Sequence, residues 1–165
     1  MMKTLLLLRH AKSSWKESGV KDFDRPLNQR GLKAAPTIGR LLRKRKLQLD
    51  LVLSSPAERA RQTTQLVLDA AGLNTELRYD ERIYEASGAR LLEIISQLDD
   101  EAGVVMMVGH NPGFEELLES LTGAAHSLST AALACVELDI EKWNKVRAGV
   151  NRLAWLVKPK ELKSK

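Results

Sequence analysis

The sequence has a single cysteine, Cys135, which excludes an internal disulfide. It also has only three histidines, so a structural zinc site built from cysteine and histidine is not expected. Cys135 lies in the apolar segment 131–138 and is interpreted as a small core residue. This cysteine usage is consistent with a reducing compartment.

Aromatic residues make up only 4% of the chain, so aliphatic side chains must build the core. No apolar run reaches the length of a membrane span. The apolar run Leu5–Leu8 is too short for the core of a secretion signal, and Arg9 ends it abruptly. We therefore expect a cytoplasmic protein with no membrane partner.

The balance of 44% hydrophobic and 28% charged residues is that of a soluble globular protein. The length of 165 residues predicts one domain over 1–158, followed by a basic tail at 159–165.

Acidic residues are outnumbered by basic ones, which gives a formal net charge of +5. The excess is concentrated at Arg40–Lys46 and at Lys158–Lys165. Both runs are able to attract nucleic acid or an acidic partner. We favour the simpler interpretation of a solvated helix end and a frayed terminus, because no aromatic residues are interleaved to stack on bases. A nucleic-acid partner is not expected.

Apolar runs and helical spacing alternate along the chain. Ser55 and Asn111 each precede a proline and are predicted to cap helices. Alternating strands and helices predict one α/β domain with a mainly parallel sheet, whose last two strands pair antiparallel. The expected strands are 4–8, 49–53, 104–108, 131–138 and 150–157, with a short edge strand near Leu77, and the expected helices are 32–46, 55–71, 89–98 and 112–123.

Three of these apolar strands are followed by a polar turn that carries arginine or histidine. Ligands bind outside the carboxyl ends of the strands in open α/β sheets. If the three strands are parallel, two arginines and two histidines face one crevice. The turns are Leu8-Arg9-His10, Ser54-Ser55-Pro56-Ala57-Glu58-Arg59 and Gly109-His110-Asn111-Pro112.

Such a crevice suits a phosphate or a similar anion. The planar fork of arginine donors fits phosphate oxygens bidentately. An imidazole among arginines tends to be neutral, since nearby positive charge lowers its pKa, and a neutral ring nitrogen is a nucleophile. The arginines then stabilise charge on the transferring phosphoryl group. This chemistry requires no metal and no cofactor, and the sequence offers no clear metal-binding cluster.

The three turns, in this order, resemble the histidine phosphatase superfamily, which includes the cofactor-dependent phosphoglycerate mutases. The small SixA-like phosphohistidine phosphatases are the closer match. The segments Ala11–Trp15, Asp22–Asn28 and Ile83–Ala86 extend the resemblance, which covers residue 3 to about 138. It implies a phosphoglycerate-mutase-like three-layer α/β/α sandwich.

The resemblance also implies roles for individual residues. His10 matches the phosphorylated nucleophile, Arg9 and Arg59 match the phosphate-clamping arginines, and His110 matches the second histidine at the phosphoryl group. Many larger relatives have glycine and then glutamate or glutamine after the nucleophile, where this chain has Ala11 and Lys12. Those relatives also carry insertions that cover the site, for which 165 residues leave little room. Mutase activity is therefore not expected.

Five further residues are weighed between a role in the site and an ordinary structural role. Glu85 is a candidate general acid, which an alkoxide leaving group requires, or else a surface carboxylate. Lys12 and Ser13 are candidates for the phosphate-binding entrance, and Asn28 for contact with the phosphate, with loop packing as the alternative. Arg59 itself has the alternative of pairing with Glu58 or another helix acid. His126 has no motif around it and is interpreted as an incidental loop residue, Asp24 and Arg25 as a local ion pair, and Arg61 as a surface residue.

The sequence thus predicts a metal-independent phosphatase that passes through a phosphohistidine at His10. The expected substrate is phosphohistidine on a partner protein, such as a phosphotransfer domain or a carrier protein. A small phosphorylated metabolite or a phosphoserine protein is the alternative within this chemistry. A non-catalytic module that binds phosphate or an acidic partner is the alternative from another class, and the intact set of His10, Arg9 and Arg59 argues against it.

Overall fold

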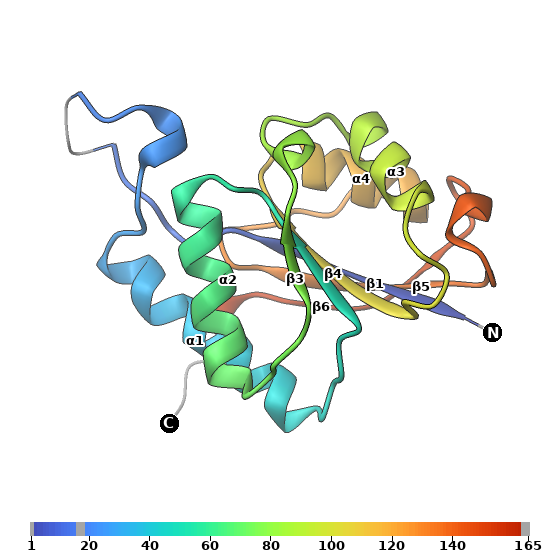
Figure 1. The fold of residues 1–165 in the computed structure, drawn as a ribbon, viewed down its shortest axis with the longest axis horizontal. Helices are drawn as coiled ribbons and strands as arrows, with labels where there is room; N and C mark the ends of the chain where they lie inside the picture. Colours follow the sequence, from blue (N-terminus) through green and yellow to red (C-terminus); the bar gives the residue numbers. More distant parts are fainter. Residues whose placement is uncertain (1, 16–18, 163–165) are drawn as a thin grey trace.

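The structure, a computed structural model, describes residues 2–15 and 19–162 (Figure 1). Its six-stranded sheet has the order β3-β2-β4-β1-β5-β6. The first four of these strands run parallel, β5 lies antiparallel to β1, and β6 lies antiparallel to β5. The predicted mainly parallel sheet is therefore confirmed, as are the antiparallel last pair and the short edge strand. The strands are β1 (Lys3–Arg9), β2 (Leu51–Ser54), β3 (Leu77–Tyr79), β4 (Val104–Gly109), β5 (Leu133–Leu138) and β6 (Arg152–Val157).

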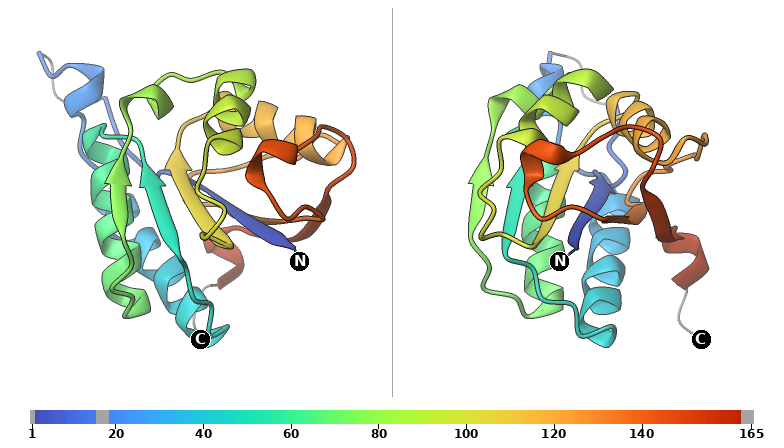
Figure 2. Two further views of the ribbon diagram at one scale, coloured as in Figure 1. Left: turned by 45° about the vertical axis from the view of Figure 1, so that its right-hand side comes forward. Right: turned by 90° about the vertical axis from the view of Figure 1, so that its right-hand side faces the viewer.

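Helices cover both faces of this sheet, which makes the predicted three-layer α/β/α sandwich (Figure 2). One layer holds α1 (Gln29–Lys44) and α2 (Glu58–Ala71), which pack against each other. The other layer holds α3 (Gly88–Ser96) and α4 (Gly113–Thr122), which also pack against each other. Within the described part of the chain, no helix combines the length and the apolar character that crossing a membrane requires.

The central strand β1 is apolar on both faces, so it packs against both helical layers. Leu5 and Leu7 are buried against the α3 and α4 side, whereas Leu6 and Leu8 are buried against the α1 and α2 side. Alternate residues of a strand point to opposite faces, and a strand buried on both faces is apolar throughout. This burial fixes β1 in the middle of the molecule and holds its carboxyl end, which bears His10, in a rigid position.

The two predicted helix caps at Ser55 and Asn111 are wrong. The Ser55 amide continues the β2–β4 pairing by donating to the Val108 carbonyl at 2.9 Å, so α2 begins only at Glu58. The Asn111 side chain donates to the Leu128 carbonyl at 2.9 Å, and Pro112 occupies the cap position of α4. The Ser55 side chain contacts His110 and the Asn111 side chain contacts Leu128, and neither long-range contact can be predicted from the local sequence.

Helix α1 begins three residues earlier than predicted, at Gln29, because Asn28 caps it. The Asn28 side-chain oxygen accepts a hydrogen bond from the Gly31 amide at 2.9 Å. Gly31 lies directly beneath the segment that follows His10, and a Cβ on it would come within 2.2 Å of the Lys12 carbonyl oxygen. The helix start therefore supports the loop that carries the first predicted site residues. Pro36 is tolerated inside this helix.

Candidate active site

The three predicted turns meet at one edge of the sheet, as the sequence predicts. Strands β2, β4 and β1 are adjacent and parallel, so their carboxyl ends lie side by side. The His10 amide donates to the Gly109 carbonyl at 2.9 Å, which holds the first turn against the third. The rings of His10 and His110 are consequently 5.2 Å apart between centroids.

His10 is nearly buried, with 8% of its surface exposed. Its Nδ1 lies 2.7 Å from the Ala11 carbonyl oxygen. A carbonyl only accepts, so Nδ1 carries the hydrogen and donates it. The lone pair of the neutral ring is then on Nε2, which is the atom left for nucleophilic attack. The Ala11 amide donates to the Thr63 hydroxyl at 2.9 Å, which ties this segment to α2.

Both histidines are neutral at physiological pH. Burial, aided by the positive charge of Arg59 and Arg9, outweighs the hydrogen bond to the Ala11 carbonyl and lowers the pKa of His10 to about 3. Burial and the charge of Arg59 lower the pKa of His110 to about 4. The neutral nucleophile expected from the sequence therefore has a physical basis in the structure.

His110 contacts the second turn through Ser55. Its Nε2 lies 2.7 Å from the Ser55 hydroxyl oxygen, which also accepts a hydrogen bond from the Ala57 amide at 3.2 Å. In the tautomer in which the serine hydroxyl donates to Nε2, the hydrogen of His110 lies on Nδ1. That Nδ1 is buried and has no hydrogen-bond partner among the described residues. It is a donor available to an anion.

The two arginines come from different elements, Arg9 from the end of β1 and Arg59 from α2, and both interact electrostatically with the two histidines. Arg59, in the first turn of α2, is 6% exposed, and Arg9 donates through a terminal nitrogen to the Leu128 carbonyl at 3.0 Å. The Nε of each is buried and lacks a partner among the described residues. With His110 Nδ1, these atoms make three unpartnered buried donors at one site. Buried donors are rarely left unpaired, so this grouping indicates a site for an oxyanion.

Asp22 is a site residue to which sequence analysis gave no role. Its side chain accepts hydrogen bonds from Arg59 at 3.1 Å, from Tyr84 at 2.5 Å and from Arg25 at 2.9 Å, and its backbone carbonyl accepts from Arg59 at 2.7 Å. Arg59 therefore pairs with Asp22 and not with Glu58, and Arg25 pairs with Asp22 and not with Asp24. Asp22 and Tyr84 lie in segments of the family resemblance. However, the contacts of Asp22 with Arg59 and with Tyr84 span 37 and 62 positions in the sequence, which no local pattern predicts.

The Asp22 carboxylate is ionised over the whole physiological range. Burial raises its pKa, but the hydrogen bonds from Tyr84 and Arg25 and the charge of Arg59 outweigh this and lower the pKa to about 2. In turn, burial and the bond to Asp22 raise the pKa of Tyr84 to about 12. Asp22 thus places a fixed negative charge beside Arg59, the residue that is predicted from the sequence to bind the phosphate.

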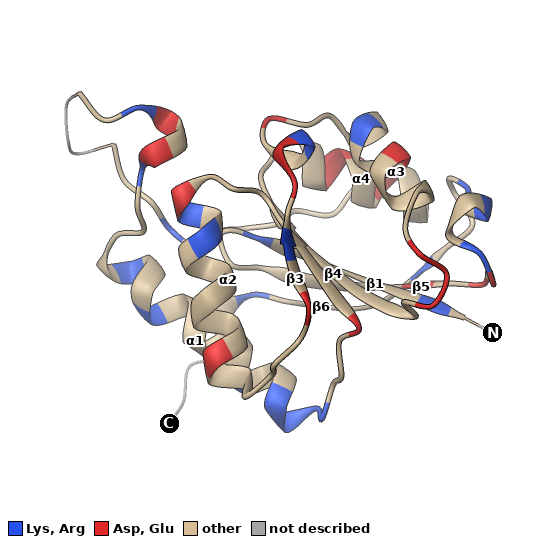
Figure 3. Ribbon diagram, in the orientation of Figure 1, with Lys and Arg blue, Asp and Glu red and all other residues tan. Residues whose placement is uncertain are grey.

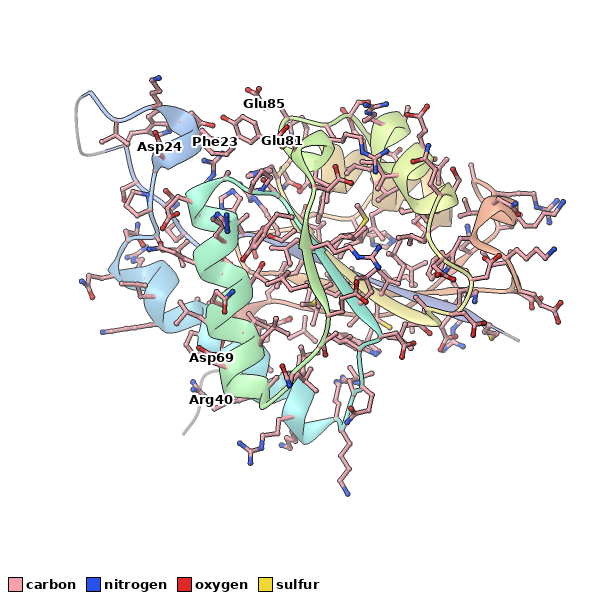
Figure 4. All side chains as sticks on the ribbon, in the orientation of Figure 1. Phe23, Asp24, Arg40, Asp69, Glu81 and Glu85 are labelled. Carbon is pink, nitrogen blue, oxygen red and sulfur yellow. The ribbon has the colours of Figure 1, made fainter. Side chains whose placement is uncertain are left out.

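A cavity of about 470 Å³ opens at this edge and reaches Arg59 and His110, with His10 beside His110. Glu85 lies at its rim and is exposed, with its backbone in the left-handed region at φ 59°. Figure 4 shows Glu85 at the outer edge of the molecule, above Phe23. Its carboxylate forms no hydrogen bond to a described residue, so the structure leaves it free to face a substrate. The lining residues are Asp22, Arg59, Tyr84, Glu85, Ala86, Ser87, His110, Asn111, Pro112 and Glu116.

Lys12, Ser13 and Asn28 do not line this cavity, and neither do Arg9 and His10, although the His10 ring lies beside that of His110. Asn28 caps α1 and donates to Ser14 at 2.7 Å, and Ser13 donates to the Pro26 carbonyl at 2.7 Å. Both therefore act in loop packing, the alternative that the sequence left open. Lys12 is exposed and lines a separate hollow of the surface. Across residues 2–15 and 19–162, no group of three or more histidine, cysteine or acidic side chains is placed to hold a metal ion.

The depressed histidine pKa values predict a loss of stability in acid. Between pH 6.5 and the folded values of about 3 and 4, the unfolded chain binds protons at these positions and the folded chain does not. The free energy of unfolding therefore falls as the pH drops, by about 2 kcal/mol per histidine between pH 6.5 and pH 5. Asp22 titrates below this window and adds nothing to it.

Urea unfolding at pH 7 and pH 5 measures this effect. His10→Asn and His110→Asn should each show a smaller difference between the two pH values than the wild-type protein. His126→Asn, outside the cavity at Arg59 and His110, is the matched control and should keep the full difference. Identical pH dependence in all four proteins would show that the two site histidines are not held neutral by the fold.

Comparison with known proteins agrees with this site. The family model of the histidine phosphatase superfamily (branch 1) matches residues 5–94. An uncharacterized protein of Mycobacterium tuberculosis (strain CDC 1551 / Oshkosh) is 39% identical over 119 residues, which are 70% of this chain and 72% of that protein.

Solved structures extend the similarity to nearly the whole chain. A crystal structure from Agrobacterium tumefaciens, named as a candidate phosphohistidine phosphatase SixA, has a TM-score of 0.82 and 34% identity over 95% of this chain and 98% of that one. The protein histidine phosphatase SixA in complex with tungstate has a TM-score of 0.83 over 97% of this chain and 99% of that one. At 23% identity, the latter shows the fold alone.

Proposed function

This chain belongs to the histidine phosphatase superfamily, and we propose that it is a phosphatase that acts through a phosphohistidine intermediate at His10 without a metal ion. We propose further that the substrate is phosphohistidine on a partner protein. Membership of the family and the similarity to SixA structures support phosphatase activity. The phosphohistidine intermediate at His10, the independence from a metal ion and the choice of substrate are argued from the geometry of the site.

The observation that carries the proposal is the set of unpartnered donors around a neutral imidazole. Arg9 Nε, Arg59 Nε and His110 Nδ1 are buried without partners among the described residues, and His10 keeps a free lone pair on Nε2. Donors fixed in a buried site stabilise charge that develops during a reaction without reorganisation at that moment. The arrangement therefore serves phosphoryl transfer, in which charge spreads over the equatorial oxygens.

In the proposed reaction, His10 Nε2 attacks phosphorus in line with the leaving group. A bond forms between nitrogen and phosphorus while the bond to the leaving group breaks, and Arg9, Arg59 and His110 hold the equatorial oxygens. Water then attacks the phosphohistidine and releases inorganic phosphate, which returns His10 to its neutral form. The arginines supply the positive charge that a metal ion supplies in other phosphotransferases.

The residues at the cavity mouth favour an imidazole as the leaving group. An imidazole departs without a strong acid, because its distal nitrogen already carries a hydrogen. Asp22 is ionised and cannot donate a proton, and Glu116 accepts a hydrogen bond from the Gly88 amide at 2.9 Å, so Glu85 at the rim is the candidate acid for an alkoxide. Asp22, Glu85 and Glu116 also line the cavity with negative charge, which disfavours small metabolites with a second anionic group.

The test is phosphate release by the purified protein in the presence of EDTA. The substrates are a histidine-phosphorylated phosphotransfer domain, para-nitrophenyl phosphate and a phosphoserine peptide. We expect EDTA-insensitive turnover with a marked preference for the phosphohistidine domain. Preference for either monoester would contradict the substrate proposal, and activity that EDTA abolishes would contradict the metal-independent mechanism.

Asp22 and a bound phosphate compete for the same guanidinium. Asp22→Asn removes the fixed negative charge from Arg59 and keeps the size of the side chain, so we expect inorganic phosphate to inhibit about tenfold more tightly. Asp24→Asn is the matched control. Asp24 lies in the same 3-10 helix as Asp22, but the hydrogen bonds of Arg59 to this helix all go to Asp22. An unchanged or weaker inhibition constant in Asp22→Asn, measured by competition, would show that Asp22 does not oppose anion binding.

A further inference from the structure

A second hollow, of about 360 Å³, lies outside the candidate active site and has a basic lining. We refer to it as the basic pocket. None of its lining residues is acidic, and four of them are cationic. They are Lys12, Arg30, Ala34, Ser129, Thr130, Lys158, Pro159 and Lys160.

The sheet topology places the basic pocket at the same edge as His10. Strand β6 is antiparallel to β5, and β5 is antiparallel to β1, so β6 runs parallel to β1. Leu8 is paired with Leu133, which is paired with Val157, and the three lie in one row across the sheet. Lys158 therefore follows β6 at the edge where His10 follows β1, two strands away.

The C-terminal segment of the basic pocket is held in place and is not a frayed end, which corrects the simpler interpretation of the sequence for residues 158–162. The 3-10 helix Pro159–Leu162 lies against α1, and Leu162 packs against the core cluster beneath that helix. The Glu161 carboxylate accepts a hydrogen bond from the Lys158 amide at 2.8 Å, which closes the turn. Residues 163–165 lie outside the described part of the chain.

The four cationic side chains of the basic pocket, Lys12, Arg30, Lys158 and Lys160, form no ion pair with a described residue. Like charges gathered in a hollow repel one another and focus a positive potential on it. Figure 3 shows the contrast with α4, where acidic residues predominate, while basic residues predominate on α1. Of the basic residues on α1, Arg30 lines the basic pocket.

We propose that the basic pocket docks an acidic surface of the phosphorylated partner protein while the phosphorylated side chain enters the crevice at His10. This proposal rests on the proposed function and names the kind of partner. Complementary charge at an interface speeds encounter and fixes orientation. A nucleic acid is the less suitable occupant, because no aromatic side chain lines the pocket to stack on bases.

Reversal of two charges in the pocket tests the proposal. Lys158→Glu/Lys160→Glu should lower kcat/KM for an acidic, histidine-phosphorylated phosphotransfer domain about tenfold or more at low salt. A short phosphohistidine peptide without acidic side chains and para-nitrophenyl phosphate offer no acidic surface to the pocket, so their turnover should be unchanged, which also shows that the variant is folded. Lys33→Glu/Arg40→Glu is the charge-matched control, because both residues are exposed on α1 outside the pocket.

Binding to the inactive variant His10→Asn separates failure of docking from failure of the proposed function. Titration of this variant with the same phosphotransfer domain should give an affinity that falls with added salt and is lost in Lys158→Glu/Lys160→Glu. Unchanged binding and turnover after the charge reversal would overturn the docking proposal alone, as would an equal loss in the control. Tighter binding of a single-stranded oligonucleotide in the pocket would overturn it in favour of nucleic acid. An acidic domain that binds the pocket but is never dephosphorylated would contradict the proposed function instead.

Discussion

Replacement of His10 by asparagine should lower kcat/KM by on the order of 10⁵-fold, the largest effect that we expect from any single substitution. Loss of a covalent nucleophile has a cost of this size in other enzymes, because water must then attack the substrate directly. Asparagine keeps a polar side chain in a position that is 8% exposed, so the fold should persist. The measurement is steady-state turnover of the phosphohistidine domain.

Two comparisons make this result specific to the nucleophile. Inhibitory phosphate should still bind to His10→Asn, since Arg9, Arg59 and His110 remain. His126→Asn should turn over at the wild-type rate, because His126 does not line the cavity at Arg59 and His110. A variant of His10 that retains a tenth of the wild-type rate would contradict the covalent mechanism.

Replacement of Arg59 by methionine should lower kcat/KM by about 10² to 10³-fold, the cost usually observed when one donor to a developing negative charge is removed. Arg59 offers an unpartnered Nε to the site and is 6% exposed. Arg59→Lys should recover only part of the loss, because lysine keeps the charge but lacks the planar fork. The fall should be mainly in kcat if the contact strengthens in the transition state.

Arg61→Met is the matched control for this prediction. Arg61 lies two residues further along α2, is exposed, and stacks on the Tyr79 ring at 4.0 Å. We expect its replacement to leave kcat/KM within about twofold of the wild-type value, as is usual for surface substitutions. If Arg61→Met and Arg59→Met lose activity equally, the loss reflects damage to α2 and not a missing donor.

The sequence was sufficient to predict the sheet edge because the relevant signals are local. Apolar runs of strand length end at Arg9-His10, at Ser54-Ser55 and at Gly109-His110, and parallel strands necessarily align their carboxyl ends. The neutral state of the histidines also followed from their neighbours. The structure adds that burial, more than the arginines, is the main cause.

The parts of the site that the sequence did not predict depend on contacts between distant segments. Asp22 meets Arg59 and Tyr84 only once the segment Asp22–Asp24 packs against α2. Ser55 and Asn111 are residue types that favour helix caps. Their side chains instead form long-range hydrogen bonds, with His110 and with the Leu128 carbonyl respectively. Local propensity is a weak guide where tertiary contacts compete for the same polar group.

The most direct test of the proposed mechanism is to trap the phosphorylated enzyme during turnover. The protein is mixed with excess phosphohistidine domain, quenched in alkali to preserve phosphoramidate bonds, digested and analysed by mass spectrometry. We expect one added phosphoryl group on the peptide that contains His10, with none on that peptide in His10→Asn. Release of phosphate with no phosphoryl group on His10, or with the group on His110 instead, would contradict it.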